Sequence, residues 1–134
     1  MFQTRVIQTQ RSGELIEITD AVREMVRRSG IRQGVVVVST PDADAGILCT
    51  SFHDPKGHED ILDDFERIWP ARTAFHFTGS MVKGAAHGKS ATAGACMDFI
   101  VEAGQLALGD SQGIFFAEYC ESQSREYQVK VFGC

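Results

Sequence analysis

Polar residues that could do chemistry lie in four short segments of this 134-residue chain. Residues 41–46 carry two aspartates, and residues 53–58 carry two histidines and a further aspartate. A third segment contains His76, His87 and Lys89, and the fourth contains Gln112, Glu118 and Arg125. Imidazole nitrogens and carboxylate oxygens bind divalent metal ions such as zinc or magnesium, and lysine and arginine hold phosphate groups. We therefore expect a functional site to include residues of these segments.

The histidines and one aspartate suggest a metal centre. We interpret His76, His87 and Asp42 as three candidate ligands that leave a position for water or substrate. Each residue also has a simpler interpretation, because an aspartate after a strand is commonly a turn former and a lone histidine is commonly solvated. Arg125 followed by Glu126 is most simply a surface pair. The metal hypothesis thus requires the fold to bring three separated residues together.

The pattern of apolar residues predicts an α+β fold: a single domain over residues 1–134, built as a mostly antiparallel β-sheet sandwich with two or three helices. The first two strands, at 2–8 and 15–18, are predicted to form a hairpin through Ser12 and Gly13. The valine-rich strand at 34–40 is expected to be covered on both faces. Further strands are predicted at 47–52, 97–101, 105–108, 113–120 and 127–131.

Helices are predicted where apolar residues recur with helical spacing. The first begins after an N-cap at Thr19 or Asp20 and ends at Gly30. The second covers about 57–69 with Ile61, Leu62, Phe65, Ile68 and Trp69 on one face. Residues 71–84 are expected to form a long loop, and 85–95 a short helix at most, because this segment contains two glycines.

Composition narrows the function classes. The formal net charge is −5 with 43% hydrophobic and 23% charged residues, which is typical of a globular protein, and no basic stripe predicts nucleic-acid binding. No apolar run approaches the ~20 residues that span a bilayer, and no signal peptide precedes the first strand, so we expect a cytoplasmic protein with no membrane partner. The four cysteines are far apart and are expected to be reduced thiols: Cys49, Cys96, Cys120 and Cys134.

The C-terminal third resembles the YjbQ-like family, whose members are also described as secondary thiamine-phosphate synthase enzymes. Residues 104–118 (GQLALGDSQGIFFAE) resemble the family signature G-x-L-x-L-G-T-W-Q-x-I-F-F-x-E. Upstream, Ala45, Gly46, Asp54 and Pro55 match the family frame P-H-T-[ST]-A-G … N-E-x-x-D-P. The pairs Phe75–His76 and His87–Lys89 resemble the family segments Y-x-H and A-H-I-K. The resemblance covers nearly the whole chain.

The chain departs from the family pattern in three places. Asp42 stands where the family has its first histidine, Thr50 and Ser51 stand where it has Asn-Glu, and Asp110 and Ser111 replace Thr-Trp. The resemblance implies that the chain forms a homotrimer. It also implies a metal or anion site at the family's histidines. Asp42 either substitutes for the lost histidine or marks a site that has decayed.

What the resemblance implies for activity is thiamine-phosphate synthesis or related metal-assisted chemistry on small phosphorylated substrates, with a divalent metal, zinc or magnesium, as cofactor. The alternative is a non-catalytic ligand-binding or assembly protein that keeps a diverged remnant of the site. A redox role for Cys120 or Cys134 is weaker, because no paired cysteine or nearby basic residue marks either as a reactive thiolate. The candidate residues are Glu118, Gln112 and Asp54 for catalysis, Lys89, Arg125 and Ser51 for phosphate, and His76, His87 and Asp42 for the metal.

Overall fold

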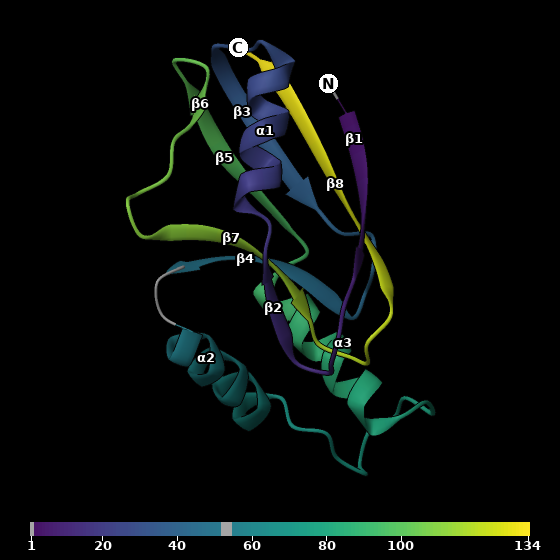
Figure 1. Cartoon of the computed structure of the whole chain (residues 1–134). Coiled ribbons are helices and arrows are strands. Elements are labelled where there is room, and N and C mark those ends of the chain that lie inside the picture. The colour runs from purple at the N-terminus through teal and green to yellow at the C-terminus, as the bar shows by residue number, and fades with distance from the viewer. Residues whose placement is uncertain (1, 52–54) are drawn as a thin grey trace.

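The computed structural model describes residues 2–51 and 55–134, which form an α+β domain of helices and antiparallel strands (Figure 1). The helices are α1 (Thr19–Ser29), α2 (Pro55–Ile68) and α3 (Met81–Ala93). The strands are β1 (Phe2–Gln8), β2 (Glu14–Glu17), β3 (Gln33–Ser39), β4 (Ala45–Ser51), β5 (Cys96–Glu102), β6 (Gln105–Leu106), β7 (Gln112–Glu118) and β8 (Ser124–Gly133). The predicted fold class is confirmed.

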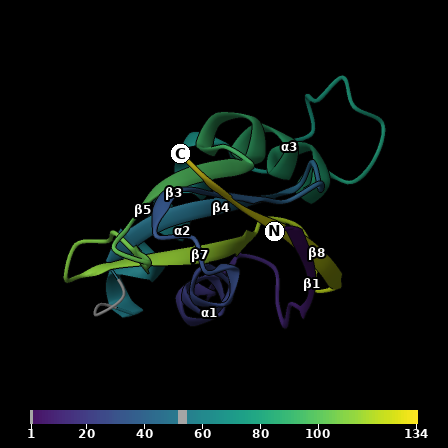
Figure 2. The same cartoon turned by 90° about the horizontal axis from the view of Figure 1, so that it is seen from above.

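The strands divide into two sheets. One has the order β1-β8-β3-β5-β6 and the other the order β2-β7-β4. Helix α1 lies on one side of the strands and α3 on the opposite side when the molecule is viewed from above (Figure 2). The main core forms where α1 meets both sheets, and its largest fully buried side chains include Met25, Ile47 and Phe116. Burial of this apolar surface is the main force that holds the two sheets together.

The predicted hairpin between the first two strands is wrong. Strand β1 pairs with β8 along its whole length, whereas β2 pairs with β7 in the other sheet. The chain therefore passes from one sheet to the other between Gln8 and Glu14. The crossing is held by Thr9, whose hydroxyl accepts a hydrogen bond from the Gln123 backbone N–H at 2.9 Å. Thr9 is buried, so this long-range contact outweighs the local turn signal of Ser12 and Gly13.

Strand β3 is covered mainly on one face, which corrects the expectation of burial on both. Val36 and Val38 are fully buried under α1, whereas Val35 and Val37 are only half-buried. Val35 lies opposite Phe132 of β8 and Ile100 of β5. Phe132 and Ile100 are exposed, as are Phe2 and Val6 of β1, which lie on the same side of the sheet. This side, which we call the outer face, therefore exposes apolar side chains among charged ones such as Lys130 and Asp98.

The helix ends follow partly from local signals. Helix α1 ends as predicted at Gly30, whose φ of 71° is the left-handed conformation that glycine adopts easily. The predicted N-cap is wrong, because Ile18 occupies that position without a side-chain cap. The Thr19 hydroxyl instead accepts a hydrogen bond from the Ile114 backbone N–H at 2.8 Å. Thr19 therefore connects α1 to β7.

Helix α3 is longer than the sequence predicts. It begins at Met81, inside the expected loop, because the Ser80 hydroxyl accepts a hydrogen bond from the Lys83 backbone N–H and caps the helix. The two glycines of α3 allow aromatic rings to approach its backbone. A Cβ at Gly84 would lie 2.9 Å from the Phe75 ring, and one at Gly88 would lie 3.2 Å from the Trp69 ring. Close packing thus compensates for glycine's low helix propensity.

Candidate functional site

A buried ion cluster centres on Arg125 at the start of β8. Its Nη2 lies 2.6 Å from Glu118 Oε2 and its Nε donates to Glu118 Oε1 at 2.8 Å. Its Nη1 donates to Asp44 Oδ1 at 2.7 Å. The side chains of Arg125 and Glu118 are 3% and 0% exposed. The guanidinium thus forms a bidentate pair with one carboxylate and a third bond with another, in a site closed to solvent.

Other groups complete this cluster. The Thr9 hydroxyl donates to Glu118 Oε1 at 2.8 Å, and the Cys120 backbone N–H donates to Glu118 Oε2 at 3.0 Å. Asp42 lies at the rim, with Oδ2 3.7 Å from Arg125 Nη1. Both Glu118 oxygens therefore have two hydrogen-bond donors each, which is the satisfaction that a buried carboxylate needs.

The electrostatics of the cluster keep Arg125 charged. Burial lowers the pKa of the guanidinium, but the hydrogen bonds to Glu118 and Asp44 outweigh burial, and the pKa is raised above its ordinary value. Three of its N–H groups already donate to carboxylates. The arrangement resembles a structural ion network that joins β7, β8 and the segment before β4.

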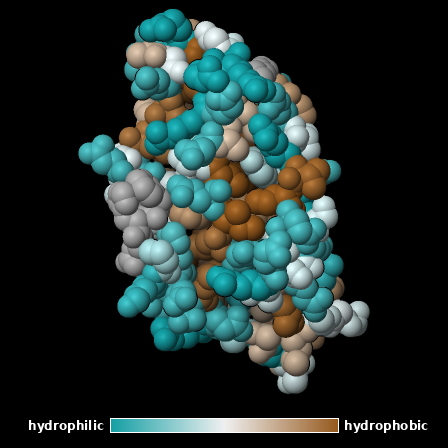
Figure 3. Space-filling view, in the orientation of Figure 1, coloured by the Kyte–Doolittle hydropathy of each residue, from teal (hydrophilic) through white to brown (hydrophobic). Residues whose placement is uncertain are grey.

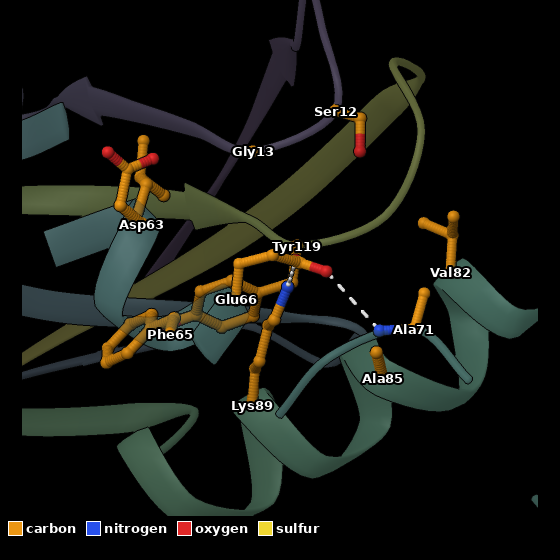
Figure 4. A pocket seen from close by; sticks show the side chains of 11 residues that line it. Ser12, Gly13, Asp63, Phe65, Glu66, Ala71, Val82, Ala85, Lys89 and Tyr119 are labelled. Atoms are coloured by element: carbon orange, nitrogen blue, oxygen red, sulfur yellow. Dashed lines mark hydrogen bonds and ion pairs between the residues drawn. The ribbon is translucent and has the colours of Figure 1, made fainter. Parts of the chain in front are cut away.

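A second polar site lies in a cavity of about 350 Å³ between α2, α3 and the end of β7. Lys89 extends from α3 toward Glu66 and Tyr119 (Figure 4). Its side chain is 9% exposed, and its Nζ lies 2.6 Å from Glu66 Oε2. Lys89 lies on the same face of α3 as Ala85, because the two are one helical turn apart. The cavity thus holds a nearly buried ammonium group.

Tyr119 lines the same cavity, but its hydroxyl is closed off from solvent beside Gly46 and has no hydrogen-bond partner. It is the one buried side-chain polar atom without such a partner among residues 2–51 and 55–134. Its ring packs edge-to-face on Phe65 of α2, with centroids 5.7 Å apart. Burial raises the pKa of Tyr119, so the hydroxyl keeps its proton and remains a donor. A buried hydroxyl without a hydrogen-bond partner lowers the free energy of unfolding, so such groups are rare in folded proteins.

Glu66 connects α2 to this cavity. The hydrogen bond from Lys89 lowers the pKa of the Glu66 carboxyl, burial opposes it, and the Ala71 backbone N–H adds a further lowering. The Glu66 side chain is 56% exposed. The Lys89 ammonium has three N–H donors, and one of them donates a hydrogen bond to Glu66.

The three expected metal ligands lie in different surroundings. Asp42 lies beside Arg125. His87 is half-buried on α3 and packs edge-to-face on Phe77, with centroids 5.0 Å apart, while His76 is exposed in the preceding loop. No group of three or more His, Cys, Asp or Glu residues in the described part of the chain is arranged to hold a metal ion. A metal centre at these residues stays a prediction.

The remaining candidates are spread along β7 and β4. Gln112 begins β7 and Glu118 ends it, so they lie about 20 Å apart at roughly 3.3 Å per residue. The Gln112 side chain is exposed and accepts a hydrogen bond from the Gly109 backbone N–H at 2.8 Å. Ser51 lies directly opposite Gln112 across the β4–β7 pair. Asp54 lies outside the described residues, as does His53.

The four cysteines are free thiols. Burial raises the pKa of Cys49, and burial also raises that of Cys120, with Asp44 and Glu118 adding to the increase and a backbone hydrogen bond at Glu121 opposing it. A raised pKa leaves Cys120 protonated near neutral pH, which weighs against a nucleophilic thiolate there.

Sequence reasoning missed several residues that form these sites. Asp44 lies in the candidate segment 41–46, but only the fold shows that Asp44 contacts Arg125 more closely, at 2.7 Å, than Asp42 does, at 3.7 Å. Tyr119 follows the buried run of β7, and a hydroxyl at the end of an apolar strand is a weak signal for a cavity. Thr9 and Glu66 carry no local signal, because their partners lie 109 and 23 residues away.

The chain matches the family model described as UPF0047 protein YjbQ-like over residues 3–134. It is 35% identical to UPF0047 protein YugU of Bacillus subtilis, over 99% of this chain and 100% of that protein. It is 32% identical to a UPF0047 protein of Methanocaldococcus jannaschii, over 95% of this chain and 91% of that one.

Solved structures share the fold. A YjbQ/UPF0047 protein of Clostridium acetobutylicum superposes with a TM-score of 0.90 at 31% identity, covering 97% of this chain and 99% of that one. A YbjQ-like protein of Sulfolobus solfataricus superposes with a TM-score of 0.94 at 28% identity, covering 100% of this chain and 97% of that one. The likeness therefore extends over at least 97% of this chain and of each of these two solved structures.

Proposed function

This chain belongs to the YjbQ-like UPF0047 family, and from that premise we propose that it binds a small phosphorylated molecule in the cavity between α2 and α3. The observation that carries the proposal is a nearly buried lysine ammonium that lines one cavity. Lys89 supplies positive charge, and it keeps N–H donors beyond the one it gives to Glu66. Phosphate oxygens accept charge-assisted hydrogen bonds from an ammonium group.

The cavity has the size and access that a small ligand needs. Its volume of about 350 Å³ falls in the range of ligand pockets, roughly 300–1,000 Å³. Phe65 and Leu62 give it an apolar wall, and the Lys89 ammonium keeps donors beyond the one it gives to Glu66. The Glu66 carboxylate already occupies the place of an anion at Lys89. An incoming phosphate would share the ammonium with Glu66 or displace it.

Direct titration tests this proposal. Isothermal titration calorimetry with inorganic pyrophosphate is expected to show saturable binding that Lys89→Met weakens by at least about tenfold, because a charge-assisted contact is lost. Lys56→Met removes an exposed lysine and is expected to leave the affinity unchanged. Equal affinities of the wild type and Lys89→Met would contradict the proposal.

The finer prediction is thiamine-phosphate synthesis, for which the motif likeness is the support. In that reaction a thiazole phosphate nitrogen forms a bond to the pyrimidine methylene carbon, and the bond from that carbon to the diphosphate breaks to release pyrophosphate. Lys89 would then neutralise the leaving pyrophosphate. Turnover with both substrates, lost in Lys89→Met, is the measurement. A divalent metal, zinc or magnesium, would assist departure, and elemental analysis of the purified protein tests for it.

A second candidate function is assembly without catalysis. The outer face exposes Phe2, Val6, Ile100 and Phe132 among charged side chains, and large apolar residues exposed beside polar ones are typical of a protein interface. We propose that this face joins copies of the chain, with a homotrimer as the expected state and a cytoplasmic location. No described helix is long and apolar enough to cross a bilayer. Pyrophosphate binding without turnover would favour this function over an enzyme.

A further inference from the structure

A second cavity lies at the other end of the molecule from Lys89, between the end of α1 and the turn that joins β5 to β6 (Figure 1). Its volume is about 480 Å³, and it shares no lining residue with the cavity of Lys89. Three arginines line it: Arg23, Arg27 and Arg32. Arg23 and Arg27 lie one helical turn apart on α1, and Arg32 precedes β3. The sequence shows no basic stripe here, because the fold brings the third arginine to the other two.

Most of this positive charge is not neutralised. Arg27 lies 2.6 Å from Glu24, which also contacts Arg28 at 2.9 Å. Within the ranges that the structure describes, the side chains of Arg23 and Arg32 form no ion pair and no hydrogen bond. Glu102, at the end of β5, accepts a hydrogen bond from the Gln33 side chain and forms no ion pair with Arg32. Two unpaired guanidinium groups therefore line one groove in a chain whose net charge is −5.

The turn between β5 and β6 closes one side of this groove. Ala103 and Gly104 both have a positive φ, of 52° and 76°. A Cβ at Gly104 would lie 3.6 Å from Arg32 Nη1, so the guanidinium of Arg32 lies against this turn. Ile31 and Leu106 add apolar surface beside the arginines. Seen from the side of Figure 1, the upper part of the molecular surface is largely hydrophilic, and an apolar band crosses the middle of the surface between α1 and α2 (Figure 3).

We propose that this groove is a second ligand site, for a nucleotide-sized molecule that carries at least two anionic groups and an organic part with apolar surface, such as a nucleoside diphosphate. Guanidinium groups bind phosphates in a bidentate manner, and two unpaired ones match two phosphates. The apolar surface of Ile31 and Leu106 suits the organic part. The volume fits one small molecule, and the closing turn limits the groove's length, which disfavours an extended polymer.

Titration of the whole chain with ADP, pyrophosphate and inorganic phosphate tests this site. ADP is expected to bind most tightly and phosphate most weakly, and the affinity is expected to fall as salt is raised. The double substitution Arg23→Ala and Arg32→Ala is expected to weaken ADP binding by about tenfold or more. Arg32→Lys keeps the charge but loses the planar fork, so an intermediate affinity is expected. Thermal unfolding of each variant confirms that it folds.

Two controls make the result specific. The double substitution Arg5→Ala and Arg11→Ala removes the same charge from exposed positions outside the groove and is expected to change ADP affinity less than twofold. Lys89→Met is expected to leave this binding intact, which separates it from the cavity between α2 and α3. The proposal is overturned if ADP shows no saturable binding, if both double variants lose affinity equally, or if a short RNA binds at these arginines and ADP does not.

Discussion

Arg125 and Glu118 face each other through two hydrogen bonds, Nε to Oε1 at 2.8 Å and Nη2 to Oε2 at 2.6 Å, although they belong to different sheets. Glu118 ends β7 and Arg125 follows the β7–β8 connection at the start of β8. Asp44 adds a third bond from the segment before β4. One guanidinium therefore ties together three stretches of chain at the point where the sheets meet.

Breaking this pair is expected to destabilise the fold strongly. Arg125→Met leaves the Glu118 and Asp44 carboxylates buried without their cation, and the free energy of unfolding is expected to fall by about 3–5 kcal/mol. Urea unfolding measures this change. Arg67→Met removes an exposed partner of Asp64 and is the matched control, with an expected change below about 0.5 kcal/mol. Similar losses in the two variants would show that burial of the cluster contributes little.

Removing the Tyr119 hydroxyl is expected to affect stability but not binding. Tyr119→Phe deletes a buried donor that has no partner, so the free energy of unfolding is expected to stay the same or to rise by about 1 kcal/mol. Pyrophosphate affinity is expected to stay unchanged, because the hydroxyl is closed off from the cavity. Urea unfolding and calorimetry of the same preparation measure both effects. A loss of stability in Tyr119→Phe would contradict the absence of a partner for the hydroxyl.

Acid is expected to weaken the attachment of α2. Lys89 lowers the pKa of Glu66 below its ordinary value of 4.5 in the folded chain. The contact therefore stabilises the fold fully above pH 4.5, and this contribution is lost as pH falls through the lowered pKa. Because Glu66 is more than half exposed, the contribution is at most about 1 kcal/mol. Glu66→Gln is expected to remove this part of the pH dependence, as measured by urea unfolding between pH 6 and 3.

If Glu66 competes with the ligand, the same substitution has a second effect. Glu66→Gln keeps the shape of the side chain and removes its charge, so pyrophosphate is expected to bind Lys89 more tightly. Calorimetry near neutral pH measures this. Weaker binding in Glu66→Gln would mean that the carboxylate assists the ligand rather than occupying its place.

The outer face is expected to mediate self-association. The wild-type chain is expected to have about three times its monomer mass of 14.7 kDa in solution. Ile100→Lys and Phe132→Lys place charges on exposed apolar positions and are expected to yield monomers without loss of secondary structure. Analytical ultracentrifugation measures the mass, and Val82→Lys, an exposed apolar residue on α3, is the control. A wild-type monomer would contradict the assembly proposal.

Local patterns in the sequence determined most of the individual elements. The apolar spacing of Val22, Met25 and Val26 and the stop at Gly30 predicted α1, and the alternation of Tyr127, Val129 and Val131 predicted β8. These signals work because residues that share one helix or strand face are set by backbone geometry over a few positions. The family signature in residues 104–118 likewise needed no structure, and the family match confirmed it.

The tertiary structure alone decided which elements meet. No local signal shows that β1 pairs with β8 rather than β2, or that Arg125 bonds Asp44 from 81 residues away. The same holds for Lys89 with Glu66, and for Arg32 beside the helix that carries Arg23. Strand pairing is selected by the burial of both sheets against α1, which is a property of the whole chain. Contacts between distant residues follow from that global packing and leave no trace in the spacing of the residues that make them.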